Sequence, residues 1–176
     1  MSLNEYILSF ESILYGLVVS KILVEWNKML KGKKPVRHYW AYYLLTVDIF
    51  LHIIHYFFIN FDFERYQAFT NPQSFLVHAV LPPVLFTFMT YQMFPSEPKN
   101  IDLKEFLHSK IPNIFIPLLV FMIYNAIQLG TPELTSAFII FYGLIGLLTL
   151  AILIRKKRII ESFVMASFIS ISMAFL

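Results

Sequence analysis

Residues 134–154 read LTSAFIIFYGLIGLLTLAILI, an apolar run without a charged side chain. Residues 111–129, which read IPNIFIPLLVFMIYNAIQL, form a second run of the same kind. A helix of about 20 such residues crosses the hydrocarbon core of a bilayer. Both stretches therefore predict transmembrane helices, and the rest of the chain repeats the pattern.

The composition supports this prediction for the chain as a whole. Of its 176 residues, 58% are hydrophobic and 14% are charged, whereas an average soluble domain carries roughly 25% charged residues. A soluble fold of this length could not bury so much apolar surface. The chain has no Cys, which excludes disulfides, thiolate metal sites and Cys nucleophiles. We expect an all-α, polytopic transmembrane bundle in a single domain, residues 1–176.

Six segments are long enough to span or nearly span a membrane, and their expected ranges are 6–29, 39–61, 74–94, 111–129, 134–154 and 159–176. The Pro82-Pro83 pair predicts a kink in the third segment. Before the fourth segment, residues 102–108 predict a short surface helix with Leu103, Phe106 and Leu107 facing lipid. The sixth segment opens with Glu161, so it either spans the bilayer or lies in the membrane surface.

The basic residues indicate how the chain is oriented. Of the 14 Lys and Arg residues, all but Lys21 and Arg65 lie in alternate loops. Loop one holds Lys28, Lys31, Lys33, Lys34 and Arg37, loop three holds Lys99, Lys104 and Lys110, and loop five holds Arg155, Lys156, Lys157 and Arg158. The positive-inside rule places these loops in the cytoplasm. Six spans would leave both termini outside, and five would leave the C-terminus inside.

The first segment carries charged and polar residues on one face. Asn4, Glu11 and Glu25 lie within roughly 60° of one another on a helix, and Lys21 flanks them. A charge at the bilayer centre costs about 2.5–3.5 kcal/mol on insertion scales, so this stripe should face protein or water. In one interpretation Lys21 and Glu25 form an internal ion pair. In the other, the four residues line the lumen of a ring of subunits, because one small subunit cannot enclose a channel.

A second polar group lies on the second segment, where Asp48, His52 and His55 share one helical face. His78, in the third segment, would meet His55 if the two helices are neighbours. Such a set could hold a metal ion, ligate haem or relay protons. The simpler interpretation is a hydrogen-bonded cluster that joins helices two and three. We expect no cofactor, and no catalytic motif suggests an enzyme.

The chain resembles a known family over its whole length, and two N-terminal stretches carry the resemblance. Residues 11–30, which read ESILYGLVVSKILVEWNKML, precede a basic loop and the aromatic stretch HYWAYYLL at 38–45. This layout resembles the small membrane accessory proteins of type VI-B CRISPR loci. The resemblance implies a multimeric pore in the bacterial inner membrane, functionally linked to an RNA-guided effector. Such a pore strengthens antiphage defence by permeabilising the membrane of infected cells, and no direct RNA binding is expected.

The same family has been described as carrying a divergent HEPN ribonuclease element, whose signature is Arg, four to six residues, then His. Neither Arg37 nor Arg65 is followed by His at that spacing, and no His follows Arg158. We therefore expect no ribonuclease activity. Two other hypotheses stand beside the pore. One is a metal- or haem-binding redox subunit that uses Asp48, His52, His55 and His78, and the other is an inert subunit that docks a partner through its basic loops.

Overall fold

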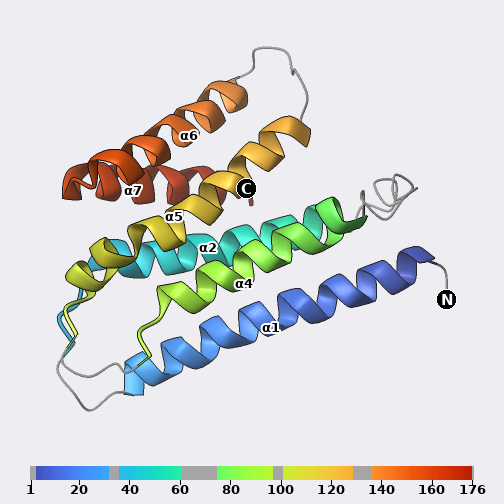
Figure 1. Ribbon diagram of the computed structural model, residues 1–176, viewed down its shortest axis with the longest axis horizontal. Coiled ribbons are helices and arrows are strands. Elements are labelled where there is room, and N and C mark those ends of the chain that lie inside the picture. The colour runs from blue at the N-terminus through green and yellow to red at the C-terminus, as the bar shows by residue number, and fades with distance from the viewer. Residues whose placement is uncertain (1–2, 32–35, 61–74, 97–100, 129–135, 176) are drawn as a thin grey trace.

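The computed structural model describes residues 3–31, 36–60, 75–96, 101–128 and 136–175. Within these ranges the chain is all-helical, which confirms the predicted fold class, and it forms six helices (Figure 1). They are α1 (Leu3–Lys31), α2 (Trp40–Asn60), η2 (Leu76–Val80) running directly into α4 (Leu81–Met93), α5 (Leu103–Gln128), α6 (Ser136–Ile154) and α7 (Lys157–Met173). The expected segment boundaries at 61, 74, 129, 134 and 176 lie outside the described residues.

Four of the described helices are long and apolar enough to cross a membrane. These spans are Glu5–Lys31, Trp40–Phe58, Leu76–Met93 and Leu103–Ile127. The described apolar part of α6, Ile139–Ile154, is shorter, and α7 is not among the four. This set of helices is that of a membrane-embedded protein.

The helices alternate in direction, and each packs on its neighbours. Figure 1 shows α1 along one edge, α4 and α2 beside it, then α5, and α6 with α7 along the opposite edge. The ends of α1, α4 and α6 and the starts of α2, α5 and α7 gather at one end of the bundle (Figure 1). The described basic residues of all three alternate loops flank these helix ends, so they share one side of the molecule.

Large aromatic side chains fill the centre of the bundle. Phe86 of α4 and Phe121 of α5 have ring centroids 4.7 Å apart, and Tyr56 of α2 lies 5.2 Å from Phe121. Phe115 of α5 contacts Phe163 of α7 at 5.3 Å. Because lipid is as apolar as these side chains, close packing rather than escape from water holds such helices together.

One expectation about α5 is wrong. This helix begins at Leu103 rather than at 111, and Leu103 and Leu107 are buried in the core instead of facing lipid. Residues 103–108 are therefore the first turns of a long helix and not a separate surface helix. Phe106 is partly buried and packs against the same core.

A local cap explains this early start. The Oδ1 atom of Asp102 accepts hydrogen bonds from the backbone N–H groups of Lys104, at 2.9 Å, and Glu105, at 3.3 Å. Such a cap satisfies N–H groups that would otherwise lack a partner at a helix start. Arg37 also donates from its backbone to Ile101 at 3.0 Å and accepts from Leu103 at 3.2 Å. The segments before α2 and α5 are thus joined, which positions α5 against the core.

The expected disturbance at Pro82 and Pro83 takes the form of a π-helical turn, Leu76–Val80, immediately before them. Neither proline has a backbone N–H to donate to the preceding turn. The N–H of Leu81 bonds instead to the carbonyl of Leu76, and the helix continues as α4. Thr87 donates its hydroxyl to the carbonyl of Pro83 at 2.7 Å.

Candidate functional site

Two acidic residues of α1, Glu11 and Glu25, face the interior of the bundle. Glu11 is 1% exposed and Glu25 is 6% exposed. Glu25 Oε1 accepts from Lys21 Nζ at 2.7 Å and from Lys28 Nζ at 2.8 Å. Lys21 Nζ also lies 5.1 Å from the ring centroid of Tyr91 on α4, a cation–π contact. The internal ion pair anticipated between Lys21 and Glu25 is therefore present.

The sequence predicted that Asn4, Glu11, Lys21 and Glu25 line a pore, and the contacts of these residues can be compared with that prediction. The side chain of Asn4 lies outside the described residues. Glu11 and Glu25 share the buried face of α1, which packs against α2 and α4. They could line a shared lumen only if α1 turned about its own axis. Their role as lining residues stays a prediction.

The opposite face of α1 points out of the bundle and carries a different stripe. Its exposed small and polar members are Glu5, Ser9, Gly16, Ser20 and Asn27. At about 100° per residue they lie within roughly 60° of one another and about half a turn from Glu25. We call these five residues the outward stripe. Exposed Leu and Ile side chains flank it, including Ile13 and Leu17, and the exposed Leu23 lies in line with Glu5 inside it.

Two details make the outward stripe suited to close helix contact. A Cβ atom added at Gly16 would meet nothing within 4 Å, so the surface there is open. Gly16 and Ser20 are four residues apart, the spacing of small residues at which transmembrane helices approach closely. The α1 span is also the least covered of the four, because 28% of its most apolar stretch is buried, against 39–44% in the other three. Charge alone drew attention to α1 in the sequence, and the spacing of Ser, Gly and Asn was the missed signal.

The polar cluster of α2 joins helices other than those expected. Asp48 is fully buried, and its Oδ2 atom accepts a hydrogen bond from Ser167 Oγ of α7 at 2.9 Å. His52 Nδ1 lies 3.5 Å from Asp48 Oδ1 and 2.9 Å from the backbone carbonyl oxygen of Asp48. The expected link between helices two and three is therefore a link between α2 and α7.

His55 and His78 do not join this group. His78 Nδ1 lies 2.7 Å from the hydroxyl of Tyr124 on α5. The ring of His55 packs against Phe175, with centroids 5.4 Å apart. Within the described part of the chain, no three His, Asp or Glu residues are grouped as metal ligands. The four residues proposed for a metal or haem site are thus divided among separate contacts.

A second polar contact joins the residue just before α2 to α7 at the basic end of the bundle. Tyr39 donates its hydroxyl to Glu161 at 3.1 Å, and Lys157 lies 3.6 Å from the same carboxylate. Burial, followed by the neighbouring Glu161 charge, raises the pKa of Tyr39 above its usual range, so Tyr39 remains a donor. Three contacts follow one another along these two segments, and the residue numbers rise on both sides: Tyr39–Glu161, Asp48–Ser167 and His55–Phe175. Helix α7 therefore runs parallel to α2 along its length rather than across its end.

No protein-family model, curated protein or solved structure matches this chain. The functional proposal accordingly rests on the residues, their contacts and the resemblance described above.

Proposed function

We propose that the protein is one subunit of a homo-oligomeric membrane pore, with the outward stripe of α1 turned towards the shared axis. The observation that carries this proposal is the stripe itself, which places five small or polar residues on the exposed face of the least covered span. A face of this kind gains little from lipid, whereas it packs well against a copy of itself or against water.

The small size of the central stripe residues, Ser9, Gly16 and Ser20, favours a ring that is closed at rest. Gly16 and Ser20 let neighbouring backbones approach, which leaves little space at the axis. The Ser9 hydroxyl donates a hydrogen bond to the carbonyl of Glu5 on the same helix at 2.7 Å. It therefore needs no hydrogen-bond partner from a neighbouring subunit in the closed ring. In an open state α1 would turn about its axis and bring Glu11, Lys21 and Glu25 towards the lumen. The mixed signs of these charges would let both cations and anions pass.

The wider role we propose is that of an accessory to RNA-guided CRISPR antiphage defence in the bacterial inner membrane. Residues 11–30 and 38–45, which carry the resemblance, support this role. The gathering of the described basic residues at one end of the bundle supports a cytoplasmic orientation for that end. The partners in this role are other copies of the chain, the bilayer and, functionally, the RNA-guided effector.

The pore is tested with the purified full-length protein in liposomes that contain an ion-sensitive dye. We expect ring-sized particles and ion flux from the wild type. Gly16→Leu and Ser20→Leu should give smaller particles and at least about tenfold less flux, because a bulky side chain separates the helices. Val120→Leu, at an exposed position on α5, is the matched control and should behave like the wild type. Monomers in mild detergent, together with tight vesicles under every condition, would contradict the proposal.

A further inference from the structure

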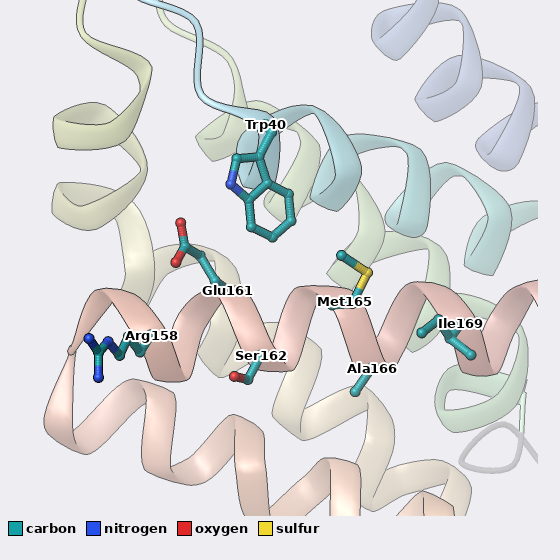
Figure 2. Close-up of a pocket in the computed structure, with 7 residues that line it drawn as sticks. All are labelled: Trp40, Arg158, Glu161, Ser162, Met165, Ala166 and Ile169. Atoms are coloured by element: carbon teal, nitrogen blue, oxygen red, sulfur yellow. The ribbon is translucent and has the colours of Figure 1, made fainter.

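A groove opens on the surface between the start of α2 and the outer face of α7 (Figure 2). Its volume is about 570 Å³, within the range of roughly 300–1,000 Å³ that is typical of small-molecule sites. Its lining residues are Trp40, Arg158, Glu161, Ser162, Met165, Ala166 and Ile169. Figure 2 shows the Trp40 ring directed towards α7, between Glu161 and Met165. The groove lies across the bundle from α1, so it is separate from the outward stripe.

One end of this groove is polar and positively charged. Within the described residues, the indole N–H of Trp40, the hydroxyl of Ser162 and the guanidinium of Arg158 have no hydrogen-bond or ion-pair partner. Glu161 is the one acidic residue of the lining, and it is engaged by Tyr39 and Lys157. The exposed basic turn before α7 adds further positive charge. This end therefore offers donors and positive charge to an anion.

The rest of the groove is apolar. Met165, Ala166 and Ile169 follow one another along the same side of α7, away from the basic turn. From Arg158 to Ile169 the helix rises by about 16 Å, at 1.5 Å per residue. That length is close to half the hydrocarbon thickness of roughly 30 Å. The groove thus changes from charged to apolar over the depth of one membrane leaflet.

We propose that this groove binds an anionic phospholipid of the leaflet on the basic side of the bundle. Arg158 and the Trp40 indole N–H hold the phosphate, and one acyl chain lies along Met165, Ala166 and Ile169. Basic side chains beside a membrane helix attract anionic headgroups, and Trp prefers the headgroup region. A second copy of the chain that met this groove with its own groove would bring together two positively charged surfaces, so the charge at the polar end of the groove favours a lipid.

Native mass spectrometry of the full-length protein in detergent tests the lipid. Dioleoylphosphatidylglycerol is added in one arm and dioleoylphosphatidylcholine in the other. The wild type should retain the anionic lipid preferentially, and Arg158→Gln should weaken its binding by about five- to tenfold, as the loss of one interfacial charge implies. Arg155→Gln is the matched control, because Arg155 is exposed in the same basic turn outside the groove. Equal retention of the two lipids, or equal losses in both variants, would overturn the proposal.

Two further variants test the headgroup contacts and the acyl-chain contacts of the lipid separately. Trp40→Phe keeps the ring but removes the N–H donor, and it should weaken binding of the anionic lipid. Ala166→Phe fills the apolar part and should displace the lipid. Glycerol phosphate, which has no acyl chain, should not compete, and effective competition by it would contradict an acyl-chain site.

Occupation of the groove by a second subunit is tested separately. The chain has no Cys, so Ser162→Cys introduces a single thiol at the edge of the groove. We expect this thiol to form no cross-link between subunits in membranes. An efficient cross-link would show that the groove is an interface between copies, which would overturn the lipid proposal. Loss of the pore proposed for α1 would leave this result unaffected, because the groove lies on the other side of the bundle.

Discussion

Ser167 on α7 donates a hydrogen bond to the Asp48 carboxylate on α2, with 2.9 Å between Oγ and Oδ2, and both residues are buried. A buried carboxylate is costly unless its oxygens have donors or a counter-charge. His52 Nδ1 lies 3.5 Å from the other oxygen, Oδ1, which accepts no hydrogen bond within the described residues. Asp48 thus fixes the depth at which α7 packs along α2, and it does so from the interior of the bundle.

Removal of the Ser167 hydroxyl should destabilise the protein. Ser167→Ala leaves Asp48 Oδ2 without its donor, and the expected loss is about 1–3 kcal/mol of unfolding free energy. Ser162→Ala is the matched control, because Ser162 is exposed on the same helix and should change stability by less than about 0.5 kcal/mol. Thermal unfolding in detergent, followed by tryptophan fluorescence, measures both variants. Equal stability of the two would mean that the buried bond contributes nothing.

The two ion pairs of Glu25, with Lys21 and with Lys28, should contribute different amounts to the free energy of unfolding. Glu25→Ala removes the acceptor of both Lys21 and Lys28, and Lys21 is partly buried, so we expect a loss of about 1–3 kcal/mol. Lys28→Ala removes a mostly exposed partner and should cost no more than about 1 kcal/mol. The same unfolding measurement ranks the two variants. A larger loss for Lys28→Ala than for Glu25→Ala would contradict the assignment of Glu25 as the shared centre.

Asp102 should make the start of α5 sensitive to acid. Hydrogen bonds from the backbone N–H groups of Glu105 and Lys104, together with the Arg37 charge, lower the pKa of Asp102 below its usual 3.8. Its contribution to stability is therefore fully present above 3.8 and is lost as the pH falls through the lower folded-state pKa.

The Asp102→Ala variant isolates this contribution. It should melt below the wild type at neutral pH, and the difference in melting temperature should shrink as the pH falls below 3.8. Asp102→Asn, which keeps an oxygen acceptor without the charge, is the control and should lose less than the Ala variant. A difference that stays constant across this range would show that the charge of Asp102 plays no part in the cap.

The sequence predicted the helices well because each apolar run is separated from the next by charged or turn-forming residues. It did not predict where α5 begins, because the cap at Asp102 and the backbone pairing of Arg37 with Ile101 and Leu103 depend on two segments meeting. Periodicity describes one helix at a time, and it cannot show which segment lies beside another.

The same limit explains why the sequence predicted only part of each candidate site. The shared face of Asp48 and His52 was visible in the sequence, whereas the partner, Ser167, lies on the last helix. The face that carries Glu11 and Glu25 was also visible, and a lone helix cannot show whether such a face points inwards or outwards. The spacing of Gly16 and Ser20 was readable, but its position on an exposed face needed the packed bundle.

Single cysteines on α1 test which face meets water in the assembled protein, because the natural chain has none. In membrane vesicles at rest, mild oxidation should cross-link Ser20→Cys between subunits at least about tenfold more than Val120→Cys, which is exposed on α5. A water-soluble thiol reagent tests the opposite face of α1. Glu11→Cys should stay unreactive at rest, since Glu11 is buried, and should become reactive under conditions that open the pore. If Ser20→Cys and Val120→Cys cross-link equally in resting vesicles, the outward stripe does not lie at the shared axis.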